Sequence, residues 1–131
     1  AFAEFAHRLP SADEGGRRSG SWGEFGRVSC YPTKNLAAAG DAGLVTAREP
    51  RHAERLRMLR HHGSRKTYYH DVLGYNSRLD EIQAAILRVK LARLDAFNAR
   101  REAIARRYGE WLAGTPLVLP QAHGRGRHIW H

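Results

Sequence analysis

One lysine stands out in a chain that otherwise relies on arginine for its positive charge. Only three of the 22 lysine and arginine residues are lysines, at positions 34, 66 and 90, and Lys34 is followed closely by small residues. Unlike arginine, a desolvated lysine can lose its proton near neutral pH and act as an amine nucleophile or form a Schiff base. Lys34 is therefore the first candidate for catalysis, and an exposed loop lysine is the alternative.

Two short apolar segments flank this lysine and predict strands. They are "RVSCY" at 27–31 and "GLVTA" at 43–47, which are rich in β-branched and aromatic residues. Pro50 then predicts the start of a helix, and Gly63 predicts its end. A strand followed by a helix is typical of α/β proteins, so the sequence predicts a fold of that class.

A longer helical pattern occupies the second half of the chain. Ser77 followed three residues later by Asp80 predicts a capping-box start. Apolar residues then recur mainly every three or four positions, at Leu79, Ile82, Ile86, Val89, Leu94 and Phe97. The pattern continues to about Ala113, as one bent helix or as two successive helices, and "PLVLP" at 116–120 is a candidate for a further strand.

The segment 61–76 has no clear periodicity and predicts a functional or an exposed loop. Its histidines at 61, 62 and 70 have no carboxylate or cysteine at a usual ligand spacing, so we expect no metal site there. Cys30 lies in an apolar strand without a neighbouring base, which favours a buried structural thiol over a nucleophile.

Bulk composition narrows the class of protein. The chain of 131 residues is long enough for one domain, and its single cysteine excludes an internal disulfide, which favours a cytoplasmic setting. No apolar run approaches the ~20 residues that span a bilayer. The net charge of +9 suits a polyanionic partner, but the arginines are scattered along helices instead of forming one block, so we do not expect nucleic-acid binding.

Three stretches together carry a specific resemblance. They are "SCYPTKNLAAAGDAGLVT" at 29–46, "RLRMLRHHG" at 55–63 and "YYHDVLGYNSRLDEIQAAIL" at 68–87. In motif order and spacing they closely resemble the DegT/DnrJ/EryC1/StrS family of pyridoxal-phosphate-dependent aminotransferases, which act mainly on keto sugars attached to nucleotides. The resemblance extends over nearly the whole chain.

The resemblance implies a role for three residues. Lys34 matches the lysine that forms the internal aldimine with pyridoxal 5'-phosphate and later moves a proton between substrate and cofactor carbons. Ser29 matches the serine whose hydroxyl binds the cofactor phosphate. Asn76 matches a residue that reaches the phosphate of the neighbouring subunit, which implies a homodimer. An ordinary strand serine and a turn asparagine are the alternatives for Ser29 and Asn76.

The resemblance also implies an architecture and a reaction. Residues 1–94 correspond to the C-terminal portion of a type I large domain that binds the cofactor, and 95–131 to a connecting helix and the start of the small domain. We expect a truncated aminotransferase that passes an amino group from a donor such as glutamate to a nucleotide-linked keto sugar. The competing hypothesis is a catalytically silent remnant that binds a partner protein or nucleic acid through its basic helices.

The N-terminal stretch departs from the family pattern. Phe2 falls where the family has an aspartate that pairs with the pyridine nitrogen, and Phe5 falls where it has a glutamine. A phenylalanine cannot stabilise a pyridinium. Either the alignment slips in this stretch or the cofactor site is damaged.

Overall fold

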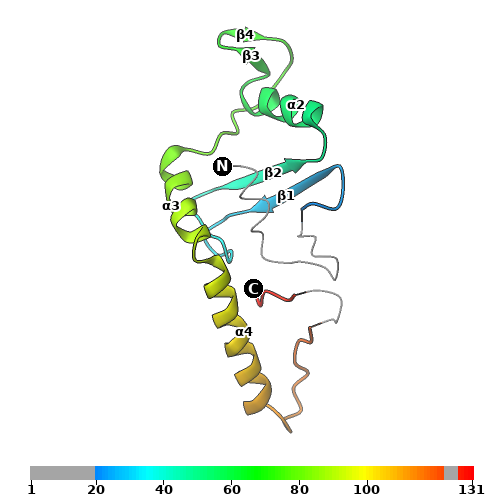
Figure 1. Ribbon diagram of the computed structural model, residues 1–131, viewed down its shortest axis with the longest axis vertical. Coiled ribbons are helices and arrows are strands. Elements are labelled where there is room, and N and C mark those ends of the chain that lie inside the picture. The colour runs from blue at the N-terminus through cyan, green and yellow to red at the C-terminus, as the bar shows by residue number, and fades with distance from the viewer. Residues whose placement is uncertain (1–19, 123–126) are drawn as a thin grey trace.

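The computed structural model describes residues 20–122 and 127–131, which form a mixed arrangement of strands and helices (Figure 1). Phe2 and Phe5 lie outside the described residues. The elements in chain order are β1 (Phe25–Ser29), β2 (Gly43–Ala47), α2 (Pro50–Arg60), β3 (Ser64–Lys66), β4 (Tyr69–His70), α3 (Glu81–Leu91) and α4 (Leu94–Trp111).

Strands β1 and β2 pair antiparallel, with Phe25 opposite Ala47 and Ser29 opposite Gly43. The predicted strand at 43–47 is confirmed, whereas the first strand begins at Phe25 and ends at Ser29, before the predicted end. The strand ends there because only the amide of Cys30 still bonds across the hairpin, to the carbonyl of Ala42. The carbonyl of Cys30 accepts a hydrogen bond from the amide of Ala38, inside the loop that joins the strands.

Helix α2 begins at Pro50, as predicted, and ends at Arg60. The amide of Gly63 bonds back to the carbonyl of Met58, and Gly63 has a φ of +73°, a conformation that favours glycine. The predicted loop at 61–76 is partly wrong, because β3 and β4 form a small antiparallel hairpin within it. This hairpin lies at one end of the long axis of the molecule (Figure 1).

The long helical pattern forms two helices, one of the two arrangements that the sequence left open. The predicted start at Ser77 is wrong: Asp80 is the N-cap of α3, and its carboxylate accepts a hydrogen bond from the amide of Gln83 at 2.8 Å. A break at residues 92–93 separates α3 from α4, and α4 ends at Trp111. No strand forms at 116–120, where the side chain of Val118 is exposed.

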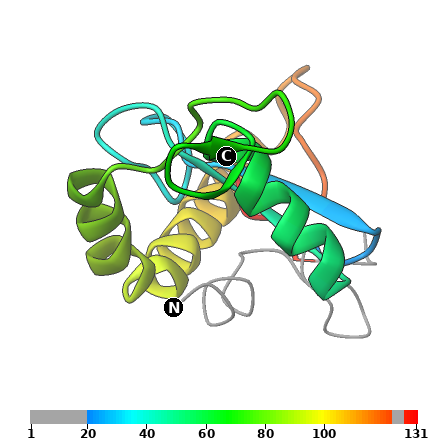
Figure 2. The same cartoon turned by 90° about the horizontal axis from the view of Figure 1, so that it is seen from above.

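The core lies where the loop at 30–42 meets α3 and α4. Its buried members are Cys30, Leu36, Ala38, Leu87 and Leu94, and the side chains of Val28, Ala42, Leu79 and Leu91 pack against them. Seen from above, α2 and α3 lie on opposite sides of the view, with the loop at 30–42 closer to α3 (Figure 2). The loop that carries Lys34 is therefore part of the core.

The predicted apolar face of α3 and α4 is only partly the buried one. Leu94 is buried as expected, but Ile82, Val89 and Phe97 are exposed, and the polar Asn98 is 2% exposed. The face turned towards the loop thus includes polar side chains that the periodicity did not select. Among the described residues, no helix is long and apolar enough to cross a membrane.

We predict that the core at α4 dominates stability. Leu94→Ala should lower the free energy of unfolding by about 2–5 kcal/mol, because it removes methyl groups from a side chain that is 1% exposed and leaves a cavity. Leu73→Ala is the matched control, since Leu73 is 97% exposed, and it should change this free energy by less than about 0.5 kcal/mol. Urea denaturation measures both, and equal effects would contradict this placement of the core.

Candidate functional site

Lys34 lies in a turn just beyond the end of β1. Its backbone amide donates to the carbonyl of Tyr31 at 2.9 Å, which fixes the turn. The side chain is half-buried, and its Nζ lies 3.4 Å from Nε2 of His131 near the C-terminus. Within the described residues no carboxylate forms an ion pair with Lys34.

Ser29 is the last residue of β1 and lies at the same end of the hairpin as Lys34. Its Oγ accepts a hydrogen bond from the amide of Tyr31 at 3.4 Å, so the hydroxyl proton remains available to an acceptor. The side chain is exposed. Gly43 pairs with Ser29 across the hairpin and keeps the opposite strand free of a side chain here. The structure therefore places Ser29 at the end of β1 and Lys34 in the loop that follows it.

Asn76 belongs to a different part of the molecule. It forms an isolated antiparallel bridge with His61, and the neighbouring amide of Ser77 donates to the carbonyl of Arg60 at 3.0 Å, so this segment is attached to the end of α2. Its side chain is exposed. In the described part of the chain, no hydrogen bond joins Asn76 to Ser29 or Lys34.

The other two lysines have different surroundings. The ammonium group of Lys66 lies 5.1 Å from the ring centroid of Tyr69, in an exposed cation–π contact. Lys90 donates from Nζ to the carbonyl of Ala37 at 2.8 Å in a partly buried position. Of the three lysines, Lys34 is the one in the loop that follows Ser29.

The histidines of the segment 61–76 make local contacts. Nδ1 of His70 lies 2.9 Å from the carbonyl oxygen of His62, and the rings of His61 and His62 are 5.8 Å apart and tilted. Across residues 20–122 and 127–131, no group of three or more histidine, cysteine, aspartate or glutamate side chains could hold a metal ion.

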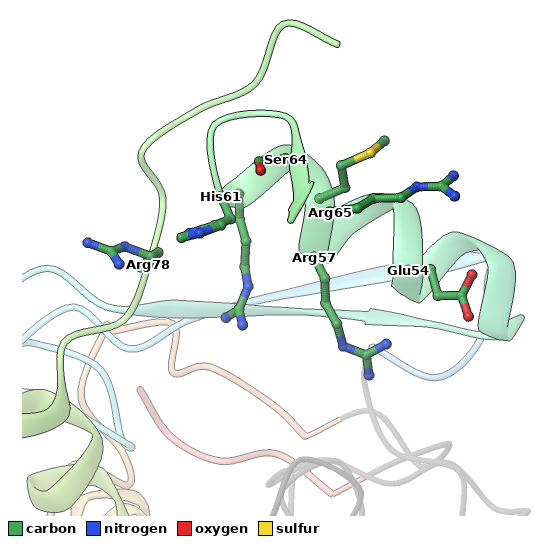
Figure 3. A pocket seen from close by; sticks show the side chains of 8 residues that line it. Glu54, Arg57, His61, Ser64, Arg65 and Arg78 are labelled. Atoms are coloured by element: carbon green, nitrogen blue, oxygen red, sulfur yellow. The ribbon is translucent and has the colours of Figure 1, made fainter. Parts of the chain in front are cut away.

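Four arginines are among the residues that line a pocket that sequence reasoning missed, and Figure 3 labels three of them. The pocket has a volume of about 480 Å³ and lies between α2, β3 and the segment before α3. Figure 3 shows Arg57 on α2 and Arg78 ahead of α3. The lining residues are Glu54, Arg57, Met58, Arg60, His61, Ser64, Arg65 and Arg78. The spacing of three between Arg57 and Arg60 was the one local signal, because it places them on neighbouring parts of a helix.

Solved structures define the class of protein to which this fold belongs. A crystal structure of DesV from S. venezuelae, an enzyme solved in complex with a ketimine intermediate, matches with a TM-score of 0.85 and 48% identity over 92% of this chain and 32% of that chain. The fold is therefore that of about a third of a pyridoxal-phosphate-dependent aminotransferase chain, which confirms the predicted α/β fold class. The sequence model that describes the DegT/DnrJ/EryC1/StrS aminotransferase family matches residues 3–131. The chain therefore belongs to this family.

Curated relatives are similar over most of this chain. The UDP-N-acetyl-3-dehydro-alpha-D-glucosamine 3-aminotransferase of Acidithiobacillus ferrooxidans is 49% identical over 116 residues, which cover 88% of this chain and 31% of the relative. The dTDP-3-amino-3,4,6-trideoxy-alpha-D-glucose transaminase of Streptomyces venezuelae is 50% identical over 117 residues, with the same coverage. The chain thus spans about a third of the length of these relatives.

The described residues of the loop fit pyridoxal phosphate, the cofactor on which the family depends. Covalent attachment needs a primary amine that is not bound to a carboxylate, and Lys34 provides one. The phosphate needs a hydroxyl or amide donor, and the hydroxyl of Ser29 retains its proton for one. The partner expected for the pyridine nitrogen falls at Phe2, outside the described residues.

Cys30 is fully buried in the core beside this site, and burial raises the pKa of its thiol. This confirms the prediction of a buried structural thiol. Because thiolate is the reactive form, the folded chain protects Cys30 from alkylation. The thiol of the unfolded chain loses its proton at a lower pH than the buried thiol does. As the pH rises above the ordinary thiol pKa, this difference lowers the stability of the folded chain.

We predict that iodoacetamide at about pH 8, near the ordinary thiol pKa, alkylates Cys30 at least about tenfold more slowly in the folded chain than in urea, because both access and thiolate formation are restricted. Mass spectrometry of timed samples measures the rate, and Cys30→Ala chains report any reaction at other side chains. Equal rates in the two states would show that the thiol is accessible.

Proposed function

We propose that this chain carries the lysine-bearing part of a pyridoxal-phosphate-dependent aminotransferase that acts on a nucleotide-linked keto sugar. The carrying observation is the placement of Lys34, half-buried and without a carboxylate partner in the described chain, in the loop that follows Ser29 at the end of β1. The names of the relatives, one a UDP-sugar and one a dTDP-sugar aminotransferase, support the substrate class.

Lys34 has two tasks in this proposal. Its amine would hold the cofactor covalently, and the same amine, when free, would accept and return a proton. Bound pyridoxal phosphate supplies the electron sink that lets an amino group pass from an amino acid to a keto group. Arginine could do neither task, because its guanidinium stays protonated. The chemistry therefore explains why a lysine occupies this position.

Ser29 and Asn76 hold the cofactor phosphate in this proposal. The hydroxyl of Ser29 donates to a phosphate oxygen, a hydrogen bond strengthened by the charge of its acceptor. Asn76 lies on a segment attached to the end of α2 and has no hydrogen bond to Ser29 or Lys34 in the described chain. A phosphate contact from Asn76 to the neighbouring subunit is compatible with this separation, so the proposed working unit is a homodimer.

Electrostatics support an anionic substrate. Four arginines and one glutamate line the pocket beside α2, which gives this surface a positive excess that attracts the diphosphate of a nucleotide-linked sugar. The proposed amino donor, glutamate, is also an anion. A cytoplasmic location and a domain boundary near residues 94–95 complete the proposal, the latter supported by the helix break at 92–93.

The arginine-lined pocket also favours a second candidate, a silent remnant that binds polyanions without specificity. The two candidates differ in salt dependence and in cofactor uptake. Binding of a polyanion through exposed arginines weakens steeply with added salt. Covalent attachment at one lysine does not follow from such binding.

We predict that borohydride reduction of the chain with pyridoxal phosphate labels Lys34 at least about tenfold more than Lys66 or Lys90, because Lys34 is half-buried in the turn that follows Ser29, the proposed phosphate ligand, whereas Lys66 is exposed and Lys90 donates to a backbone carbonyl. Peptide mapping by mass spectrometry measures the three sites. Lys34→Ala chains are the control and should lose the dominant label. Even labelling of all three lysines, or an unchanged pattern in Lys34→Ala, would contradict the proposal.

The proposed dimer makes a separate prediction. Asn76→Ala should weaken cofactor attachment by about tenfold, the cost of one hydrogen bond to a charged group. Mixing these chains with an excess of Lys34→Ala chains should restore attachment, because each mixed dimer contains one site with both residues intact. The control is the doubly substituted chain, Lys34→Ala with Asn76→Ala, which should restore nothing. If the single and double variants restore attachment equally, Asn76 does not act across an interface.

A further inference from the structure

The backbone that follows Lys34 is attached to the helices by side-chain hydrogen bonds. Three polar side chains from α3 and α4 bond to this segment, residues 35–39. The pairs are Ala39 N with Gln83 Oε1 at 2.7 Å, Lys90 Nζ with Ala37 O at 2.8 Å, and Asn35 Nδ2 with Asn98 Oδ1 at 2.9 Å. Two of these three contacts hold backbone atoms, so they fix the path of the chain directly.

Lys90 makes the one of these three contacts that has a charged donor. At a similar length, a hydrogen bond from an ammonium group is stronger than one between neutral groups. In the described chain it has no carboxylate partner, so the carbonyl of Ala37 is its polar contact. The bond is partly buried, which reduces competition from water.

The two sides of Lys34 are held by different parts of the structure. On the N-terminal side, its amide bonds to the carbonyl of Tyr31, next to β1. On the C-terminal side, Leu36 and Ala38 enter the core, and the carbonyl between them, that of Ala37, bonds to Lys90. Loss of the ammonium group would leave that partly buried carbonyl without its donor and would release the C-terminal side of the turn.

We propose that Lys90 is a positioning residue for Lys34: its ammonium group holds the carbonyl of Ala37 and so fixes the backbone from which the Lys34 amine reaches the cofactor. The proposal rests on the proposed function of Lys34. It assigns a purpose to a second lysine of this arginine-rich chain. Lys90 itself does not touch the reacting atoms.

Two readouts test this role at a temperature where circular dichroism shows every variant folded. Lys90→Met replaces lysine with an unbranched side chain of similar length that lacks the ammonium group. We expect amide hydrogen exchange in residues 35–39 to rise by about tenfold, and borohydride-trapped cofactor at Lys34 to fall by a similar factor at limiting cofactor, the effect of one charged hydrogen bond. Lys90→Arg restores a charged donor and should recover most of both values.

The matched control is Lys66→Met, which removes the ammonium group that lies over Tyr69 and should leave both readouts unchanged. Unchanged exchange and labelling in Lys90→Met would overturn the proposal, as would equal effects of the two methionine variants. If Lys90→Met does not fold, Lys90→Gln takes its place. Its side chain is uncharged and shorter, so we expect smaller increases in exchange and smaller losses of labelling. Unchanged exchange and labelling in Lys90→Gln would overturn the proposal.

The two arms separate this inference from the function on which it rests. If the unsubstituted chain does not attach pyridoxal phosphate at Lys34, the proposed function fails, and the exchange readout alone decides whether Lys90 holds the segment. If the unsubstituted chain attaches the cofactor but Lys90→Met attaches it equally well, the function stands and the positioning role is wrong.

Discussion

The anchoring of the loop at 30–42 in the core is the constraint on which the site depends. The amide of Cys30 donates to the carbonyl of Ala42, and the carbonyl of Cys30 accepts from the amide of Ala38, both at 2.8 Å. These bonds close the base of the loop, while Leu36 packs with Leu87 and Leu94 from the helices. A side chain on a free loop would sample many positions, and ordering it for binding would cost conformational entropy. In this chain the loop that carries Lys34 is already ordered by its contacts with the core.

Polar groups inside this core fix the loop at some cost in stability. Asn98 is 2% exposed, and its Oδ1 accepts a hydrogen bond from Asn35, the residue next to Lys34. Asn35 also donates to the carbonyl of Ile129, so one side chain links α4 to the C-terminal segment. In the described chain, Nδ2 of Asn98 and Oδ1 of Asn35 have no partner, and each buried unpaired group costs about 1–3 kcal/mol. A pair of apolar side chains in place of Asn35 and Asn98 would stabilise the core more, but it would not fix the position of the loop.

Local signals in the sequence predicted the elements but not their contacts. Pro50 marked the start of α2 because a proline without an amide proton suits the first helical turn. The face of α3 and α4 was harder to predict, since the periodicity selected Ile82 and Val89, which are exposed, and passed over Asn98. The contact between Lys90 and Ala37 spans 53 positions along the chain, so no local pattern contains it. The resemblance assigned Ser29 and Lys34 to one cofactor site, and the helices that hold the loop with Lys34 became visible only in three dimensions.

The three lysines show when residue type is informative in a chain dominated by arginine. At position 66 the cation lies over an exposed aromatic ring, a contact that arginine makes equally well. The presence of lysine there therefore indicates no special role. At position 90 a compact ammonium reaches a single carbonyl oxygen in a partly buried position, where a planar guanidinium would bring further donors that also need acceptors. At position 34 only an amine can lose its proton and attack a carbonyl carbon. A rare residue type is thus most informative where its chemistry excludes the common substitute, and of the three positions Lys34 meets that condition, whereas an arginine at position 90 would still supply a charged donor.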